Sequence, residues 1–273
     1  ELLQRGPAEP GGKSLISPVR MLTYTCIPLS VGMFPHMFMH WLTAEKAASF
    51  KTPLIVYPLC IAAVWIPSVL LGIFGAAEFE GLKGPAANYV LIRMIAKHAP
   101  TALAGLLCAG VFAAIMSSLD SQALSLGSMF THDIVRHYGF HDRMTEKQQI
   151  LFGRIFVFAV LALTFVLAQV TNRSIFRLGV WCFTGFAAMF PVVLSALFWR
   201  RSTKVGAIAS VLTVIVLWTF FFTKGWTNPA YTVGGTGIMP VVVILAASAV
   251  AMVVGSLISR PPEAATVSKF FRD

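Results

Sequence analysis

Seven apolar stretches, each close to the length of a membrane-spanning helix, dominate the sequence. A spanning α-helix needs about 20 mostly apolar residues to cross the hydrocarbon layer. The stretches cover residues 17–42, 53–75, 101–130, 149–170, 174–199, 205–223 and 237–259. Polar connections that often contain Gly or Pro separate them. The pattern predicts an all-α integral membrane protein with about seven transmembrane helices.

The composition excludes an ordinary soluble domain. Of the 273 residues, 57% are hydrophobic and 12% are charged, whereas soluble domains contain about 45–50% apolar and about 25% charged residues. Too few polar residues remain to cover the surface of a soluble protein of this length. We therefore expect the excess apolar surface to face membrane lipid.

The basic residues fit membrane topology better than nucleic-acid binding. The formal net charge is +10, but Lys and Arg are scattered among apolar segments instead of forming one stripe with interleaved aromatic residues. Lys and Arg gather in cytoplasmic loops of membrane proteins. The densest groups are Lys46/Lys51, Arg136/Arg143/Lys147, Arg200/Arg201/Lys204 and Arg260/Lys269/Arg272. No nucleic-acid partner is expected.

This charge distribution also predicts an orientation. It places residues 260–273 in the cytoplasm as a tail, residues 15–259 in the transmembrane bundle, and residues 1–14 outside the cell. An outside N-terminus requires a cleaved leader or an earlier spanning segment, but residues 1–14 contain neither an apolar leader region nor an initiating Met. We expect the chain to begin within a longer protein.

The first apolar stretch, residues 17–42, is interrupted by Pro28, Gly32 and Pro35. Proline lacks the backbone N–H that a helix interior needs. Two interpretations stay open. The stretch is a helix whose kink is accommodated by packing, or its backbone is unwound at membrane depth, which is tolerated where it lines a cavity.

Residues 101–134 contain the most informative pattern. Small and hydroxyl residues recur every three or four positions, which places them on one helical face: Gly110, Ala114, Ser118, Ser121, Ser125 and Ser128. Such a face can let another helix approach closely. Close packing does not explain Asp120, because a carboxylate inside a spanning segment is costly and should face a partner or a water-filled cavity.

The oxygen atoms around Asp120 suggest a cation site. Hard cations such as sodium prefer oxygen ligands. The hydroxyls of Ser117, Ser118 and Ser121, a freed backbone carbonyl near Ala114 and the Asp120 carboxylate together provide an oxygen-rich cluster. The sequence therefore predicts an ion-binding face on this segment.

Three motifs resemble those of the sodium/solute symporter family, which includes proline, pantothenate, sialic acid and sugar transporters. AAIMSSLDSQALSLGSMFTHDI is similar to the family's eighth core helix, GMFPHMFMHW to the signature on its sixth, and TGFAAMFPVVLSALFWRRSTKVGA to the end of its tenth helix and the following loop. The resemblance implies the leucine-transporter-type fold, in which two inverted five-helix repeats surround a central site. This chain would contribute the second repeat, core helices six to ten, plus two peripheral helices.

The resemblance also implies site residues. The family's sodium site falls on the Ala114 carbonyl and the Ser117 and Ser118 hydroxyls, completed by carbonyls of the first core helix, which this sequence lacks. A second sodium site found in some members falls on Ser117, Asp120 and Ser121.

The expected solute region departs from the family pattern. Met33 and Phe34 stand where the family often has Gly-Gln, and His40 stands where it often has Arg. An apolar group near the solute disfavours a polar, sugar-like ligand. Trp181 and Thr184, earlier in the stretch 174–199, are further candidates for proximity to the solute.

The function implied by the resemblance is sodium-coupled symport of a small organic solute across the plasma membrane. Na⁺ is the coupling ion, and the partners are the solute, membrane lipid and the missing N-terminal half of the protein. One alternative is a membrane sensor that keeps the symporter fold and is coupled to a cytoplasmic signalling domain. A second alternative, a multipass membrane enzyme, lacks support because no spanning segment brings His and a carboxylate together, and no catalytic residue is predicted.

Overall fold

The computed structural model describes residues 17–79, 82, 84–138, 145–171, 174–228 and 231–271, and within them the secondary structure is helical, without strands. The lead-in expected at residues 1–14 lies outside this range. The chain divides into two compact units. One combines the described residues up to Phe34 with those from Phe176 onward, and the other holds Pro35–Ile175.

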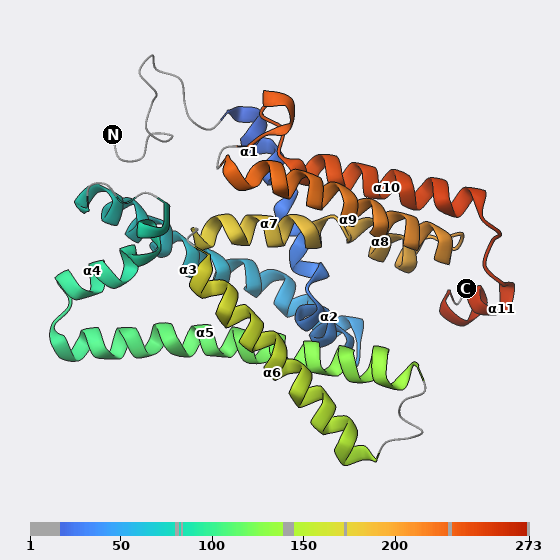
Figure 1. Ribbon diagram of the computed structural model, residues 1–273, viewed down its shortest axis with the longest axis horizontal. Coiled ribbons are helices and arrows are strands. Elements are labelled where there is room, and N and C mark those ends of the chain that lie inside the picture. Colours follow the sequence, from blue (N-terminus) through green and yellow to red (C-terminus); the bar gives the residue numbers. More distant parts are fainter. Residues whose placement is uncertain are drawn as a thin grey trace. The chain divides into compact units, whose positions relative to one another are not determined.

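The Pro35–Ile175 unit is built around the long helix α5 (Figure 1). Helices α2, α4 and α6 contact α5, and α4 also contacts α3. A capping box begins α6, since the Thr145 amide donates to Gln148 Oε1 at 2.8 Å. The elements are α2 (Pro35–Leu42), η2 (Ala47–Phe50), α3 (Lys51–Glu78), η3 (Gly84–Tyr89), α4 (Val90–His98), α5 (Thr101–Met129), η4 (Phe130–Arg136, a π-helix) and α6 (Glu146–Val170).

The other unit contains the helices with the most buried residues. Helices α9 and α10 lie side by side along much of their length, and α8 contacts both (Figure 1). The elements are α1 (Pro18–Tyr24), η1 (Ile27–Met33), α7 (Ile175–Ala187), α8 (Phe190–Phe198), α9 (Lys204–Thr227), η6 (Val233–Gly235), α10 (Pro240–Ile258) and α11 (Ala264–Phe270).

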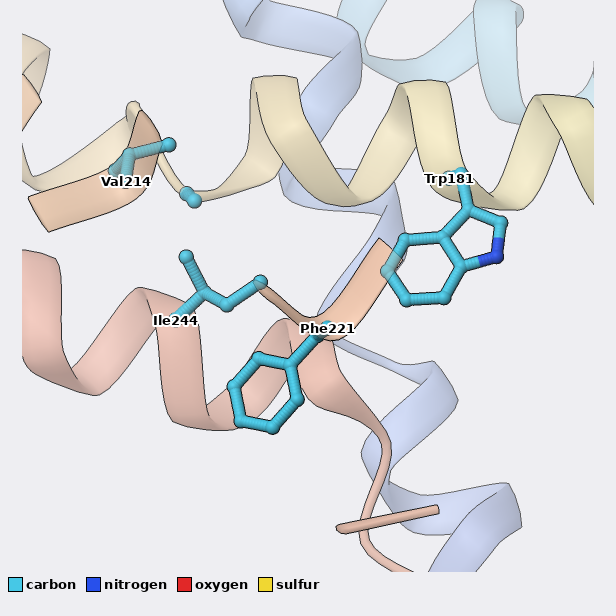
Figure 2. Packing of buried hydrophobic residues seen from close by; sticks show 5 residues of the cluster. Trp181, Val214, Phe221 and Ile244 are labelled. Carbon is cyan, nitrogen blue, oxygen red and sulfur yellow. The ribbon is translucent and has the colours of Figure 1, made fainter. Parts of the chain in front are cut away.

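Two features hold this second unit together. Its apolar core consists of Trp181, Ala188, Val214, Phe221 and Ile244, contributed by α7, the residues just after α7, α9 and α10 (Figure 2). Glycines also bring α9 and α10 close together, because a Cβ atom on Gly255 would lie 2.8 Å from the Cα of Gly206. Small residues at a helix contact allow such close approach.

Six helical segments in the described part of the chain are long and apolar enough to cross a membrane. They confirm six of the seven predicted stretches: Ala47–Glu78, Thr101–Arg136, Glu146–Val170, Ile175–Phe198, Lys204–Trp226 and Pro240–Ile258. The protein is therefore an all-α, multi-pass integral membrane protein.

The first predicted stretch, residues 17–42, differs from the others because it is divided into α1, η1 and α2. No single piece reaches spanning length. Pro28 lies in the first turn of η1, and Pro35 begins α2. The interruption predicted from the prolines is confirmed.

Candidate functional site

Helix α5 carries all the residues predicted to bind sodium. It is α-helical from Thr101 to Met129 without a break. Successive residues of an α-helix are turned by about 100° around its axis, so Ala114, Ser117 and Ser118 fall within an arc of about 100°. The structure therefore places the three residues of the first predicted sodium site on one face of one helix.

A hollow of about 440 Å³ lies on this face and is lined by Ala114, Ile115, Ser118, Leu119 and Gln122. Two of the predicted sodium ligands, Ala114 and Ser118, thus border the same space. Both side chains are exposed within the described chain. The hollow is open to an ion or to another segment.

Gln122 is a polar residue of this hollow that the sequence interpretation did not select. It follows Ser118 by four residues, which is the spacing of neighbours on one helical face. Its side-chain amide oxygen is an acceptor of the type that hard cations use. The spacing from Ser118 was the signal that could have identified it.

Ser117 and Ser121 lie next to each other, because the Ser121 hydroxyl donates to the Ser117 carbonyl at 3.2 Å. One turn later, the buried Ser125 hydroxyl donates to the Ser121 carbonyl at 2.9 Å. A serine hydroxyl has one hydrogen and two lone pairs. The Ser121 oxygen therefore keeps acceptor capacity for a cation after it has donated its hydrogen.

Asp120 points in a different direction from Ser118. The two residues lie about 160° apart around the axis of α5, whereas Asp120 and Ser117 are about 60° apart. Asp120 is exposed and forms no ion pair within the residues that the structure describes. The structure groups Asp120 with Ser117 and does not bring it together with Ser118.

The freed carbonyl expected near Ala114 is not present. Helix α5 is continuous through this residue, so its carbonyl lies within the regular helix. A carbonyl oxygen has two lone pairs, and one remains for a cation even when the other accepts the helical hydrogen bond. The Ala114 carbonyl can therefore still bind a cation while it accepts a helical hydrogen bond.

Phe34, one of the residues predicted to lie near the solute, belongs to an aromatic cluster with α7. Its ring centroid lies 5.5 Å from that of Phe183 and 4.7 Å from that of Phe186. Met33 precedes it at the end of η1, and both residues are partly buried. We refer to Phe34, Phe183 and Phe186 as the Phe34 cluster.

Trp181 and Thr184, the other two solute candidates, are buried at 9% and 2% exposure. The Trp181 ring packs inside the α7–α9 core (Figure 2), and its carbonyl accepts from Trp218 Nε1 at 2.9 Å. The Thr184 hydroxyl donates to the Val180 carbonyl at 2.8 Å. Both residues are engaged in packing and helix contacts.

Arg177 has a contact that the sequence did not suggest. Its guanidinium donates to the backbone carbonyls of Gly225 and Trp226 at the C-terminal end of α9. The last carbonyls of a helix lack intrahelical partners, so an arginine satisfies them and joins α7 to α9. A single arginine near the start of an apolar stretch was the available signal.

Comparison with known proteins gives a consistent match. The pattern of the Sodium:solute symporter family matches residues 7–213. The osmoregulated proline transporter of Bacillus subtilis is 25% identical over 264 residues, which are 95% of this chain and 51% of that protein. The sodium/proline symporter of Escherichia coli is 29% identical over 257 residues, or 86% of this chain and 46% of that protein. The chain thus spans about half the length of these curated relatives.

Proposed function

The chain belongs to the sodium:solute symporter family, and we propose that it forms part of a transporter that couples inward movement of sodium to uptake of a small organic solute. The observation that carries this proposal is the exposed row of oxygen ligands on α5, at Ala114, Ser117 and Ser118. The proposed activity is transport across the plasma membrane and not enzymatic catalysis.

The first sodium ion is proposed to bind the Ala114 carbonyl and the hydroxyls of Ser117 and Ser118. The hollow beside Ala114 and Ser118 gives room for a cation, and Gln122 adds an oxygen on the same side. Three or four ligands on one face of a helix do not surround an ion. We propose that backbone carbonyls from the N-terminal half of the same protein complete the coordination, in line with the roughly twofold greater length of the relatives.

A second sodium ion is proposed to bind Ser117, Asp120 and Ser121. The Ser121–Ser117 hydrogen bond and the position of Asp120 about 60° from Ser117 support this grouping. A negative carboxylate near the membrane interior gains most from a bound cation. The two sites would share Ser117 and use opposite flanks of α5.

The solute is proposed to be proline or a similar small amino acid. The names of the relatives above include proline. The Phe34 cluster offers an apolar aromatic wall, which suits a ligand with an apolar ring better than a sugar. Met33 and Phe34 would face the solute. Trp181 and Thr184 remain candidates for a role near it, and their burial favours support of this wall from behind.

Coupling follows from differential affinity. An ion or solute shifts a conformational equilibrium only by as much as it prefers one state over the other. If sodium on α5 and solute at the Phe34 cluster both favour the state that proceeds to release, each raises the affinity for the other by the same factor. Membrane lipid is the proposed partner of the exposed apolar faces of the helices.

The test is uptake of radiolabelled L-proline by the full-length protein in proteoliposomes. An inward sodium gradient should drive accumulation, whereas equal potassium or proton gradients should not. The alternative of a symporter-fold sensor predicts sodium-dependent proline binding without accumulation. Accumulation that is independent of sodium would contradict the proposal.

A further inference from the structure

The stretch 174–199 was predicted as one spanning segment, and its helix is interrupted at Ala188 and Met189, between α7 and α8. Pro191 has no amide hydrogen to donate in the helix. The Val192 amide, which would bond Ala188 in a continuous helix, donates to the Met189 carbonyl at 3.1 Å. The break therefore deprives the Ala188 carbonyl of its normal partner at a fully buried position.

Helix α10 supplies the substitute donor. The Ser248 hydroxyl donates to the Ala188 carbonyl at 2.8 Å, and Ser248 and Ala188 are both 0% exposed. A buried carbonyl without a partner is strongly disfavoured. Ser248 thus satisfies a buried backbone carbonyl that the break deprives of its helical donor.

Ser210 on α9 orients Ser248. The two hydroxyl oxygens lie 2.8 Å apart, and the Ser210 hydroxyl also lies 3.0 Å from the Ser248 carbonyl. Each hydroxyl has a single hydrogen. Because the carbonyls of Ala188 and Ser248 can only accept, Ser248 donates to the Ala188 carbonyl, and the single Ser210 hydrogen is shared between the carbonyl and hydroxyl oxygens of Ser248. The hydrogen bonds therefore run in one direction, from α9 through α10 to the break.

The break directly follows the residues that face Phe34. Phe183 and Phe186 lie in the last turns of α7, and Ala188 comes two residues after Phe186. A change in the bend at Ala188 would therefore alter how this end of α7 presents its aromatic rings.

We propose that Ser248 is a positioning residue for solute binding. Its hydroxyl, held by Ser210, fixes the bend between α7 and α8 and thereby the aromatic rings that pack on Phe34. The part of this inference that concerns solute rests on the proposed transport function. The part that concerns the bend does not.

The bend can be measured directly in the full-length protein by electron-spin distance measurements. Spin labels replace the exposed residues Phe176 on α7 and Leu197 on α8, in a background without other reactive cysteines. Ser248→Ala should shift or broaden the distance distribution, and Ser210→Ala should do so to a smaller extent. Ser210→Ala also decides the matter if Ser248→Ala does not fold.

Ser256→Ala is the matched control, because Ser256 is on the same helix, is also 0% exposed, and accepts from the Thr203 amide away from the break. Its distance distribution should coincide with that of the unsubstituted protein. An unchanged distribution in both Ser248→Ala and Ser210→Ala would overturn the proposal. An equal change in Ser256→Ala would also overturn it, since the effect would then be general loosening.

Proline uptake gives the second readout. Ser248→Ala should raise the KM for L-proline about tenfold while changing the maximal rate less than about twofold. Ser248→Thr, which keeps the hydroxyl, should restore much of the KM. If the unsubstituted protein shows no sodium-driven uptake, the proposed function fails, and the distance measurement still tests the bend. A normal KM in Ser248→Ala beside a shifted distance would contradict the positioning role.

Discussion

The serines of α5 and those of the α9–α10 pair all lie in long apolar helices, but their hydroxyls are used differently. The α9–α10 pair contains three fully buried serines, Ser210, Ser248 and Ser256. Each forms a hydrogen bond outside its own helix, and the partner of Ser256 is the amide of Thr203 at the start of α9. Ser117 and Ser118 are exposed, and no bond of their hydroxyls is seen in the described part of the chain.

The difference separates two roles of one residue type. A hydroxyl whose bonding capacity is met inside the chain fixes how its helices pack. A hydroxyl that stays open on a helix of a membrane protein needs another partner, because unsatisfied polar groups are disfavoured in the hydrocarbon layer. Substitutions of the buried serines in α9 and α10 should therefore change stability, and substitutions of the open serines in α5 should change sodium binding.

The largest effect is expected at the closest contact between α9 and α10. A Cβ atom on Gly206 would lie 2.7 Å from the Met252 carbonyl oxygen and 2.9 Å from the Ser256 nitrogen. Because backbone atoms cannot move aside easily, Gly206→Val should lower the stability of the full-length protein by about 3 kcal/mol or more, measured by thermal unfolding in detergent. Gly105→Val on α5, where no atom lies within 4 Å of the added Cβ, should be tolerated. Equal losses of stability in both variants would contradict the proposed difference between the α9–α10 contact and α5.

Removal of a proposed sodium ligand should have the next largest effect. Ser118→Ala should raise the sodium concentration for half-maximal uptake about tenfold or more, since a polar contact with a charged group contributes about 1.5–3 kcal/mol. Thermal stability without sodium should change little. Ser125→Ala is the control, because its hydroxyl is already bonded to the Ser121 carbonyl. A normal sodium dependence in Ser118→Ala would remove this residue from the site.

Ser256→Ala should lower stability without changing sodium binding, which is the opposite of Ser118→Ala, and its effect should be smaller. It removes the acceptor of the Thr203 amide at the start of α9. The Thr203 hydroxyl keeps its contact with Ser259 at 2.6 Å, so the loss of stability should be about 1 kcal/mol. Sodium affinity should equal that of the unsubstituted protein. A weakened sodium affinity would show that the two regions are not separable.

Asp120→Asn is expected to affect the first sodium site only weakly. Asp120 lies about 160° from Ser118 around α5, so half-saturation by the sodium ion at Ser118 should change less than about threefold. The Hill coefficient for sodium in uptake should fall, because the second ion loses its carboxylate. A large loss of affinity with an unchanged Hill coefficient would mean that one site includes both residues.

Much of the helical architecture follows from local sequence. The long apolar stretches predicted seven spanning segments, of which the described residues confirm six, and the prolines at positions 28 and 35 predicted the interruption of the first. The break at Ala188 was not predicted, although Pro191 marks it, because prolines at positions 58 and 67 lie inside α3 without ending it. Whether a proline breaks a membrane helix depends on neighbouring groups that can satisfy the freed carbonyls.

Residue spacing in the sequence predicted only part of the candidate site. Helical periodicity placed Ala114, Ser118 and Ser121 on one face, and the unbroken helix agrees. Ser117 entered the predicted sodium site through the family resemblance. The pairing of Ser210 with Ser248 could not be derived, because it depends on which helices pack together and in which register. The same limit applies to Trp181, whose indole could have faced a ligand but packs against α9.

Direct sodium binding tests the central claim most closely. Equilibrium binding of radioactive sodium to the purified full-length protein, without solute, should be saturable. The double variant Ser117→Ala/Ser118→Ala should lose this binding, whereas Ser125→Ala and Ser256→Ala should keep it. Sodium binding by the double variant with the same affinity and stoichiometry as the unsubstituted protein would contradict the assignment of the ion to the open face of α5.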